Sequence, residues 1–158
     1  MAAGHASRDE WREHALEELR RAGHRSGGAR SAVVDLMARQ HCCLTAQEVF
    51  DRLREDGQVI GIASVYRALD LLSRMSLVHR LDLADAAYYE PAHPGGEHHH
   101  HVVCDRCGKV SQFEDQELEA AIERLAGRLK YDVAAHDVVL RGSCPNCKQR
   151  RRPTAHSE

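Results

Sequence analysis

Two pairs of cysteines have the most specific spacing in this sequence. Cys104 and Cys107 form one C-x-x-C pair, and Cys144 and Cys147 form a second. This spacing lets two thiolates reach one ion from a tight turn, and two such turns complete a tetrahedral zinc site. Two reactive dithiols of the thioredoxin type are the alternative, but two equal pairs in one small domain are rarely both redox-active. The four cysteines therefore predict a structural zinc site.

A run of four histidines stands just before the first cysteine pair. In an extended strand successive side chains point to opposite faces. His98 and His100 would then share one face, and His99 and His101 the other. One run can thus contribute ligands to two separate metal sites. The alternative is a solvated histidine-rich loop with adventitious metal affinity, which the neighbouring cysteine pair disfavours.

Further ligands for each of these sites lie elsewhere in the chain. Glu119 lies beside the apolar stripe of a predicted helix, and His136 lies within a predicted final strand. With His98 and His100 they make a plausible four-ligand site in the C-terminal half. Partners for His99 and His101 could come from the region before the run: His79, Glu90, His93 and the pair Cys42 and Cys43. His79 taken alone is equally well interpreted as a surface residue.

Composition limits the classes of protein that can present these ligands. The chain has 158 residues, 42% of them hydrophobic and 29% charged, which fits one soluble domain or two small ones. The net charge of −2 excludes a strongly basic, histone-like mode of nucleic-acid binding, so any such surface must be local. Six Cys and twelve His accompany only seven aromatic residues. With so few aromatic residues, two small domains would have thin hydrophobic cores, and such domains usually need a metal or a partner subunit.

The compartment is expected to be the cytoplasm. No apolar run approaches the roughly 20 residues needed to span a bilayer, and the N-terminus has no signal-peptide core. Thiols in the cytosol stay reduced, so paired cysteines indicate metal ligands before disulfides.

The first half of the chain predicts helices. Ser7 begins a capping-box pattern, and a second helix is expected after the break at Gly27 and Gly28. Thr45 begins another capping box, and Gly57 stands where that helix should end. The following segment, Ser64 to Met75, predicts a further helix that Ser64 can cap.

A hairpin is expected after that helix. The residues from Leu77 to Glu90 change to a period of two around a small-residue turn. Helix, turn, helix and hairpin outline a winged helix-turn-helix, with Ser64 to Met75 as the recognition helix. Tyr66 and Arg67 would project from its N-terminal part towards bases or phosphates, although an ordinary solvated helix face is the alternative. The predicted DNA-binding residues are Ser64, Tyr66, Arg67, Arg25 and Arg30.

A Pro- and Gly-rich stretch separates this half from the rest. We therefore predict an α+β protein with a winged-helix domain at 1–90, a linker at 91–97 and a metal-binding dimerisation domain at 98–148. A disordered tail is expected at 149–158. The second domain is expected to contain a strand-like stretch from His98 to Phe113, an amphipathic helix and a strand from Val133 to Arg141. That helix would bury Leu118, Ala121, Ile122, Leu125 and Leu129.

Taken together, these residues resemble the ferric uptake regulator superfamily of bacterial metal sensors. The match extends from about Arg21 to Cys147. The residues responsible are the segment Ile60 to Leu69, the run His98 to Cys104, Cys107, Gly108, Glu119, His136 and the last C-x-x-C pair.

The resemblance implies a homodimer that represses transcription at palindromic operators in double-stranded DNA when it holds metal. It assigns the four cysteines to structural Zn²⁺. His98, His100, Glu119 and His136 match a sensory or accessory site. His99 and His101 match a regulatory site at the hinge, completed by residues such as His79, Glu90 and His93. Tyr66 and Arg67 match the pair that contacts DNA.

Several departures bear on the effector metal. His100 stands where many iron sensors have an aspartate, which is more similar to the zinc uptake regulators, and nitrogen ligands suit zinc. Yet zinc regulators place an aspartate near His79 and a cysteine near His93, and Cys43 falls where iron and peroxide sensors have a histidine. Gly27 to Arg30 replaces the usual Pro-Arg pair. We expect Zn²⁺ as the effector, with Fe²⁺ second and a peroxide sensor as the third alternative.

Two other classes of function fit less well. A zinc deaminase or metalloprotease would need an H-x-E with P-C-x-x-C or an H-E-x-x-H motif, and neither occurs. A zinc-storage module would not need a helix-turn-helix. We therefore expect no enzymatic activity, no small organic substrate and no membrane partner.

Overall fold

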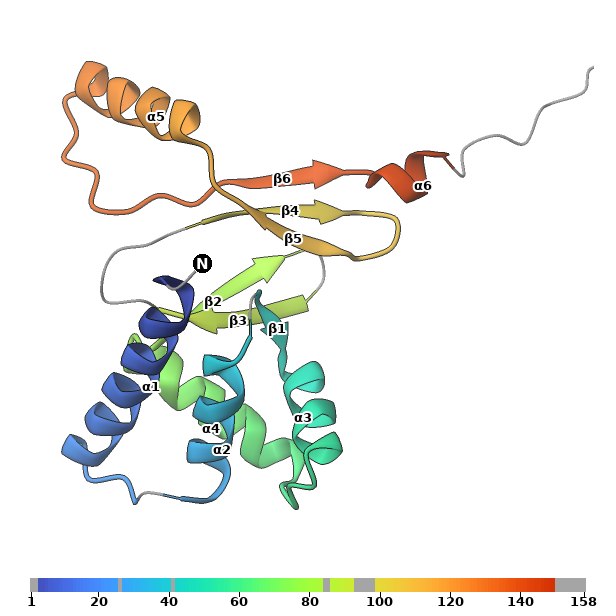
Figure 1. Ribbon diagram of the computed structural model, residues 1–158. Helices are drawn as coiled ribbons and strands as arrows, with labels where there is room; N and C mark the ends of the chain where they lie inside the picture. Colours follow the sequence, from blue (N-terminus) through green and yellow to red (C-terminus); the bar gives the residue numbers. More distant parts are fainter. Residues whose placement is uncertain (1–2, 26, 41, 84–85, 93–98, 150–158) are drawn as a thin grey trace, which may run out of the picture. The chain divides into compact units, whose positions relative to one another are not determined.

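The computed structural model describes the backbone of residues 3–25, 27–40, 42–83, 86–92 and 99–149, and side chains from residue 8 onward (Figure 1). The chain divides into two compact units, Met1–Glu97 and His98–Glu158, called here the N-terminal and C-terminal units. No helix among the described residues is long and apolar enough to cross a membrane. Helices and sheets occur in both units, which confirms the α+β class.

Helices form most of the N-terminal unit. They are α1 (Ala3–Arg21), α2 (Gly28–Ala38), α3 (Ala46–Glu55) and α4 (Ile62–Arg74). Their apolar sides meet in one core that includes Trp11, Met37 and Leu72, all fully buried. The Trp11 indole N–H donates to the Leu77 carbonyl at 2.9 Å, which fastens α1 to the segment that enters the hairpin. The helices therefore hold the hairpin at a fixed place in this unit.

The ends of α3 follow the predicted capping chemistry. The Glu48 N–H donates to Thr45 Oγ1 at 3.2 Å, and the Thr45 N–H donates to Glu48 Oε2 at 2.8 Å. Gly57, just past the helix, has φ 77°, a conformation that glycine adopts without steric cost. The predicted capping box and helix end are confirmed.

Two predicted helix starts are wrong. α1 begins at Ala3, so Ser7 lies inside the helix and does not cap it. α4 begins at Ile62, with Gly61 as its extended N-cap residue and no side-chain cap. The Ser64 N–H instead bonds to the Gly61 carbonyl at 2.9 Å, which places Ser64 in the first turn. The N-cap residue of α4 is therefore Gly61, and not Ser64 as predicted.

A three-stranded antiparallel sheet completes the N-terminal unit. Its strands are β1 (Leu44–Thr45), β2 (Val78–Leu83) and β3 (Ala86–Pro91), in the order β1-β3-β2. β2 and β3 form the predicted hairpin after α4 and complete a winged helix-turn-helix (Figure 1). β1 was not predicted, because two residues show no alternation. β3 extends one residue into the segment predicted as linker.

The C-terminal unit pairs a small sheet with two helices. Its elements are β4 (His100–Cys104), β5 (Val110–Phe113), α5 (Gln116–Leu129), β6 (Val139–Gly142) and α6 (Pro145–Gln149). The strand order is β5-β4-β6, with β4 antiparallel to β5 and parallel to β6. The single strand-like stretch expected up to Phe113 is thus two strands, joined by the turn that holds Cys107. The Asp115 side chain accepts from the Leu118 N–H at 2.8 Å and caps α5.

The end of this unit differs from the sequence prediction. The last strand covers only Val139–Gly142, so His136 precedes it instead of lying within it. The reason is that β6 pairs only along the short strand β4, which leaves 131–138 without a ladder. Helix α6 was not predicted and includes Gln149, the first residue of the expected tail. The remainder of that tail lies outside the described residues.

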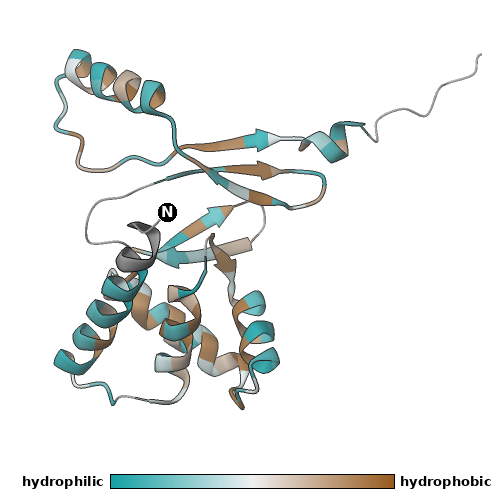
Figure 2. Cartoon of the chain, in the orientation of Figure 1, coloured by the Kyte–Doolittle hydropathy of each residue, from teal (hydrophilic) through white to brown (hydrophobic). Residues whose placement is uncertain are grey.

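Contrary to the prediction, the apolar side of α5 is not fully buried. Hydrophobic and hydrophilic residues alternate along the helix (Figure 2), but none of its residues is fully buried. Leu125 is 44% exposed and Leu129 is 59% exposed, and Leu140 on β6 is 51% exposed. α5 thus has the sequence pattern of an apolar face, but no described part of the same chain covers that face fully.

Candidate metal centres

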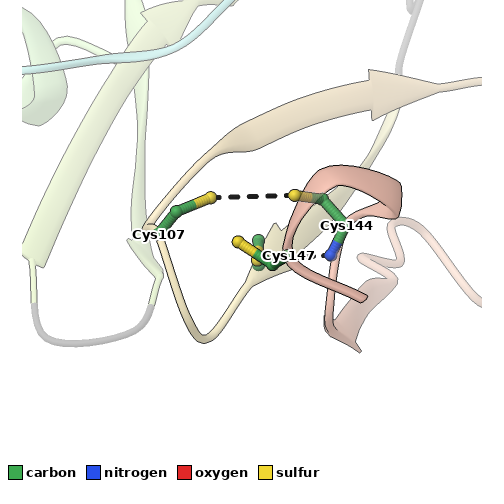
Figure 3. Close-up of side chains that lie close together, drawn as sticks. Cys107, Cys144 and Cys147 are labelled. Atoms are coloured by element: carbon green, nitrogen blue, oxygen red, sulfur yellow. Dashed lines mark hydrogen bonds between the residues drawn. The ribbon is translucent and has the colours of Figure 1, made fainter. Parts of the chain in front are cut away.

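Four cysteine sulfurs converge in the C-terminal unit. Cys104 is the last residue of β4, and Cys107 lies in the turn before β5. Cys144 directly precedes α6, and Cys147 lies within it. All four sulfurs lie within 4.8 Å of one another. The Cys107 and Cys144 side chains point towards each other, with their sulfurs 3.8 Å apart, and Cys147 lies beside them (Figure 3). The structure thus brings together all four predicted ligands.

Backbone pairing positions these thiols. The parallel register sets Cys104 beside Gly142, so the chain leaving β6 arrives next to the first cysteine pair. In the turn, the Gly108 N–H donates to the Cys104 carbonyl at 2.8 Å, and Gly108 has φ 70°. The Arg106 guanidinium also donates to the Cys147 carbonyl at 3.0 Å, which connects the two pairs.

The thiols differ in their affinity for protons. The N–H of Cys144 donates to Cys104 Sγ at 3.3 Å. Donors from this group and from the Cys107 backbone lower the pKa of Cys104 to about 6. Hydrogen bonds with Cys107 and Cys144 raise the pKa of Cys147 to about 12. Four neighbouring thiols cannot all ionise by themselves, and a tetrahedral cation is the group that would let them do so.

A second cluster in the C-terminal unit combines two imidazoles and a carboxylate. His100 Nε2 lies 2.6 Å from Glu119 Oε1, and His136 Nε2 lies 3.0 Å from Glu119 Oε2. The ring centroids of His100 and His136 are 5.4 Å apart. His100 is only 2% exposed and packs against Phe113, with ring centroids 5.5 Å apart. Three of the four predicted ligands are therefore together, and His98 lies outside the described residues.

This cluster has the chemistry of a site for a borderline divalent cation. Its three donor atoms lie within 4.8 Å of one another. Two imidazole nitrogens and one carboxylate suit Zn²⁺ or Fe²⁺ better than a hard cation such as Mg²⁺. Glu119 reaches the site because its helix begins at the Asp115 cap, directly after β5. His136 reaches it from the irregular segment before β6, and not from a strand as expected.

The residues predicted for the hinge site lie in both units. In the C-terminal unit, His99 and His101 place their ring centroids 5.1 Å apart in an edge-on arrangement, and His101 is 3% exposed. In the N-terminal unit, His79 lies opposite Glu90 in the β2–β3 ladder. Glu90 is buried and His79 is exposed. His93 lies outside the described residues.

Cys42 and Cys43 form a further thiol pair, in the N-terminal unit. Their sulfurs are 3.8 Å apart, and Cys43 is 5% exposed. The pKa of Cys43 is raised above its ordinary value. The largest cause is its hydrogen bond with the Cys42 side chain, followed by burial and by the charges of Cys42 and Glu90. The sequence predicts this pair only as candidate partners for His99 and His101.

The winged-helix surface presents the predicted DNA-contacting pair. Tyr66 is 48% exposed on α4. Arg67 is exposed beside it and donates to Ser64 Oγ at 3.1 Å. The opposite side of α4 is buried through Val65, Leu69 and Leu72. Arg25 is exposed before α2, and Arg30 is half-buried within it.

The family model for the ferric uptake regulator family matches residues 21–141 of this chain. A ferric uptake regulation protein from Neisseria meningitidis is 30% identical over 138 residues, which cover 84% of this chain and 92% of that protein. The peroxide-responsive repressor PerR of Staphylococcus aureus is 31% identical over 143 residues, covering 87% of this chain and 95% of the repressor.

Solved structures agree with this grouping. The Helicobacter pylori ferric uptake regulator has a TM-score of 0.78 at 25% identity and covers 89% of this chain and 93% of that one. The Vibrio cholerae regulator has a TM-score of 0.72 at 27% identity, with 81% and 98% covered. The fold and the site therefore define the class of this protein: an α+β protein of two units, with a winged helix and clustered metal ligands. The chain belongs to the ferric uptake regulator family, whose members are transcription regulators and not enzymes.

Proposed function

We propose that this protein is a metal-dependent transcriptional repressor in the cytoplasm that binds operator DNA as a homodimer when it holds its effector metal. Its targets would be metal-uptake genes, with Zn²⁺ as the first choice of effector. One observation supports this most: a winged helix with Tyr66 and Arg67 exposed occurs in the same chain as two ligand clusters in the C-terminal unit.

Each cluster has a proposed role. The four cysteines hold a structural Zn²⁺ that joins the β4–β5 turn to α6. His100, Glu119 and His136, with His98, form a sensory or accessory site. The H. pylori relative is described as having three functional metal-binding sites, which supports more than one role for metal here.

The regulatory step is proposed at the hinge. Glu90, His79 or His93 from the N-terminal unit would share an ion with His99 and His101. Because such ligands come from two units, metal binding favours one orientation of the winged helices. An ion that binds only this form shifts the population towards it, and linkage then raises DNA affinity. Loss of metal releases the operator and permits transcription.

Fe²⁺ is the second candidate effector, since relatives include ferric uptake regulators as well as a peroxide-responsive repressor. A peroxide sensor would lose DNA binding when its iron-loaded form meets peroxide. Imidazole at His100 in place of a carboxylate favours Zn²⁺ over Fe²⁺.

Metal-dependent operator binding tests the proposal. Protein that retains its cysteine-bound zinc but lacks labile metal is titrated with buffered Zn²⁺ and, anaerobically, with Fe²⁺, on promoter DNA from the source genome. Specific binding that tightens with Zn²⁺ supports a zinc-uptake repressor, and tightening only with Fe²⁺ reassigns the effector. Absence of specific binding with either ion would overturn the repressor function.

A further inference from the structure

We propose that four basic side chains around the four-cysteine cluster set how tightly that cluster holds zinc. They are called here the basic rim and consist of Arg106, Lys109, Arg141 and Lys148. All four are exposed and belong to the C-terminal unit. Their role depends on the proposed structural zinc: the cysteines bind the ion, and the basic rim determines the strength of the binding through its charge.

Positive charge is concentrated in the two segments that contain the cysteine pairs. Segments 104–109 and 141–148 contain four basic residues and one acidic residue, Asp105, whereas the whole chain has a net charge of −2. Arg141 lies 3.9 Å from Asp105, and both side chains are about half exposed. Exposed ion pairs of this kind contribute little. The basic rim therefore carries an excess of positive charge in a chain that is acidic as a whole.

Two members of the basic rim share a cavity with the cysteines. The Lys109 carbonyl accepts from the Cys104 N–H at 2.9 Å. Arg141 pairs with Val103 in the parallel register of β4 and β6. A cavity of about 250 Å³ is lined by both basic residues and by Cys104 and Cys144. No described residue that lines this cavity carries a carboxylate, so two cations and two thiols lie around one small space.

The other two members are held at the cluster by hydrogen bonds. The Arg106 guanidinium donates to the Cys147 carbonyl at 3.0 Å, although 41 positions separate the two residues. Arg106 lies within the first C-x-x-C pair and thus brings its charge to the second pair. Lys148 directly follows Cys147, and its N–H donates to the Cys144 carbonyl at 2.8 Å. Basic residues therefore adjoin both cysteine pairs.

Zinc binding changes the charge that the basic rim surrounds. Cysteines bind zinc as thiolates, so S–H bonds break, four Zn–S bonds form, and the protons leave to solvent. Largely protonated thiols are thereby replaced by an ion and four thiolates with a combined charge of about −2. Positive charges nearby stabilise this zinc-bound form more than the zinc-free form. The basic rim should therefore raise the zinc affinity, and its neutralisation should lower that affinity.

A binding site for a free anion is the other use that this cavity would have. The zinc-bound cluster already places negative charge at the cavity wall, through Cys104 and Cys144. A free anion would be repelled by that charge while it is attracted by Lys109 and Arg141. Neutralisation of the zinc-bound cluster uses the same two cations without such repulsion, and it is therefore the better-supported role.

Zinc competition with a neutral nitrogen chelator tests the basic rim, because an uncharged competitor does not itself respond to surface charge. Full-length wild type is compared with K109Q/R141Q, which removes both cations of the cavity. We expect the zinc affinity of this variant at low salt to fall at least about tenfold, as for other residues that support metal ligands. K109R/R141K keeps both charges and should retain the affinity of the wild type. R124Q/R128Q removes two charges from exposed positions on α5 and should also retain it.

Salt dependence separates this electrostatic role from a loss of packing. Dissolved salt screens exposed charges, and the Debye length falls from about 10 Å at 0.1 M to about 3 Å at 1 M. The difference in zinc affinity between the wild type and K109Q/R141Q should therefore shrink to less than about threefold near 1 M salt. Equal affinities at low salt, or a difference of the same size at every salt concentration, would overturn the proposal.

A second measurement uses the wild type alone and does not depend on any variant folding. Its zinc affinity should fall as salt rises, and an affinity that is independent of salt contradicts the basic rim. Chloride and phosphate are compared at equal ionic strength, and a change specific to phosphate would assign the cavity to a free anion instead.

Zinc content tests the proposed structural zinc separately. Wild-type protein that is isolated without tightly held zinc would count against the structural zinc itself. Zinc-loaded wild type with the same affinity as K109Q/R141Q would count only against the basic rim.

Discussion

At the scale of single residues, the four-cysteine cluster depends on ligands that stand 37 positions apart, Cys107 and Cys144. We expect Cys144→Ser to release one equivalent of zinc and to destabilise the protein by at least about 3 kcal/mol, a fraction of the roughly 10–16 kcal/mol with which structural sites hold zinc. Zinc content and thermal unfolding measure both effects. Ser143→Ala, one position earlier, is the matched control and should retain the zinc. Full zinc content in Cys144→Ser would contradict the site.

Glu119 is the residue that joins the two imidazoles of the second cluster, since its two oxygens lie 2.6 Å from His100 Nε2 and 3.0 Å from His136 Nε2. Glu119→Gln preserves the shape but removes the negative charge. We expect the zinc affinity of the labile site in this variant to fall at least about tenfold, as measured by chelator competition. Glu117→Gln, on an exposed position of the same helix, should leave the affinity unchanged. Equal affinities for the two variants would exclude Glu119 as a ligand.

The sequence anticipated these clusters unequally, for a physical reason. C-x-x-C spacing fixes local geometry, so the cysteine cluster follows from four positions alone. Alternation along a strand separated His100 from His99 and His101 as expected, and Glu119 was found from the helical period. The Cys42–Cys43 convergence was not predicted, because adjacent side chains of an extended chain point to opposite faces, whereas the chain bends at Cys42.

At the scale of elements, the capping box at Thr45 makes a stability contribution that can be isolated. Thr45→Ala removes the acceptor for the Glu48 N–H, 3.2 Å away. We expect a loss of about 1 kcal/mol in the free energy of unfolding, within the usual range for an N-cap. Urea denaturation measures it. Gln47→Ala, exposed in the first turn of the same helix, should change it by less than about 0.5 kcal/mol. A loss in Gln47→Ala as large as in Thr45→Ala would contradict the assignment to the cap.

α4 should act as the DNA-reading element through its exposed side. Tyr66→Ala and Arg67→Ala should each weaken operator binding by about 1–3 kcal/mol, roughly 5- to 150-fold, with the unfolding midpoint unchanged. The reason is that both side chains are exposed and lie away from the buried side formed by Val65 and Leu69. Arg74→Ala, at the far end of the same helix, is the control. Quantitative mobility shifts at fixed salt measure the affinities, and losses equal to that of Arg74→Ala would exclude the pair as contacts.

Elements with strong local patterns were predictable and those set by pairing were not. The capping box of α3 and the β2–β3 hairpin follow from local sequence. β1 has two residues and exists through its pairing with β3. β6 begins at Val139, which pairs with His101 near the start of its parallel partner β4, so Val133 to Val138 stay irregular despite their strand-like composition.

At the scale of the whole molecule, the two units solve the burial of apolar surface differently. The N-terminal unit encloses Trp11 and Leu72 completely. The C-terminal unit leaves apolar side chains exposed on α5 and on β6: Leu125, Leu129, Val139 and Leu140 are 36–59% exposed. An exposed apolar side of a helix, such as the one that carries Leu125 and Leu129, is typical of an interaction site. The exposed leucines of α5 fit the proposed homodimer.

The exposed leucines of α5 give the last prediction. Leu125 and Leu129 stand four positions apart, so they share one side of α5. A double change of both to Glu would place two charges in the proposed interface, where desolvation without a partner is costly. We expect the dimer dissociation constant to rise at least about 100-fold, or 2.7 kcal/mol, as for central interface residues. Analytical ultracentrifugation measures it. Arg128→Glu, an exposed position on the same helix, adds negative charge outside the leucine row and should remain dimeric. If the double variant sediments as the wild type does at every concentration, this surface is not the interface. If it becomes monomeric and also loses operator binding while keeping its zinc, then the dimer positions the two recognition helices, as the proposed function requires.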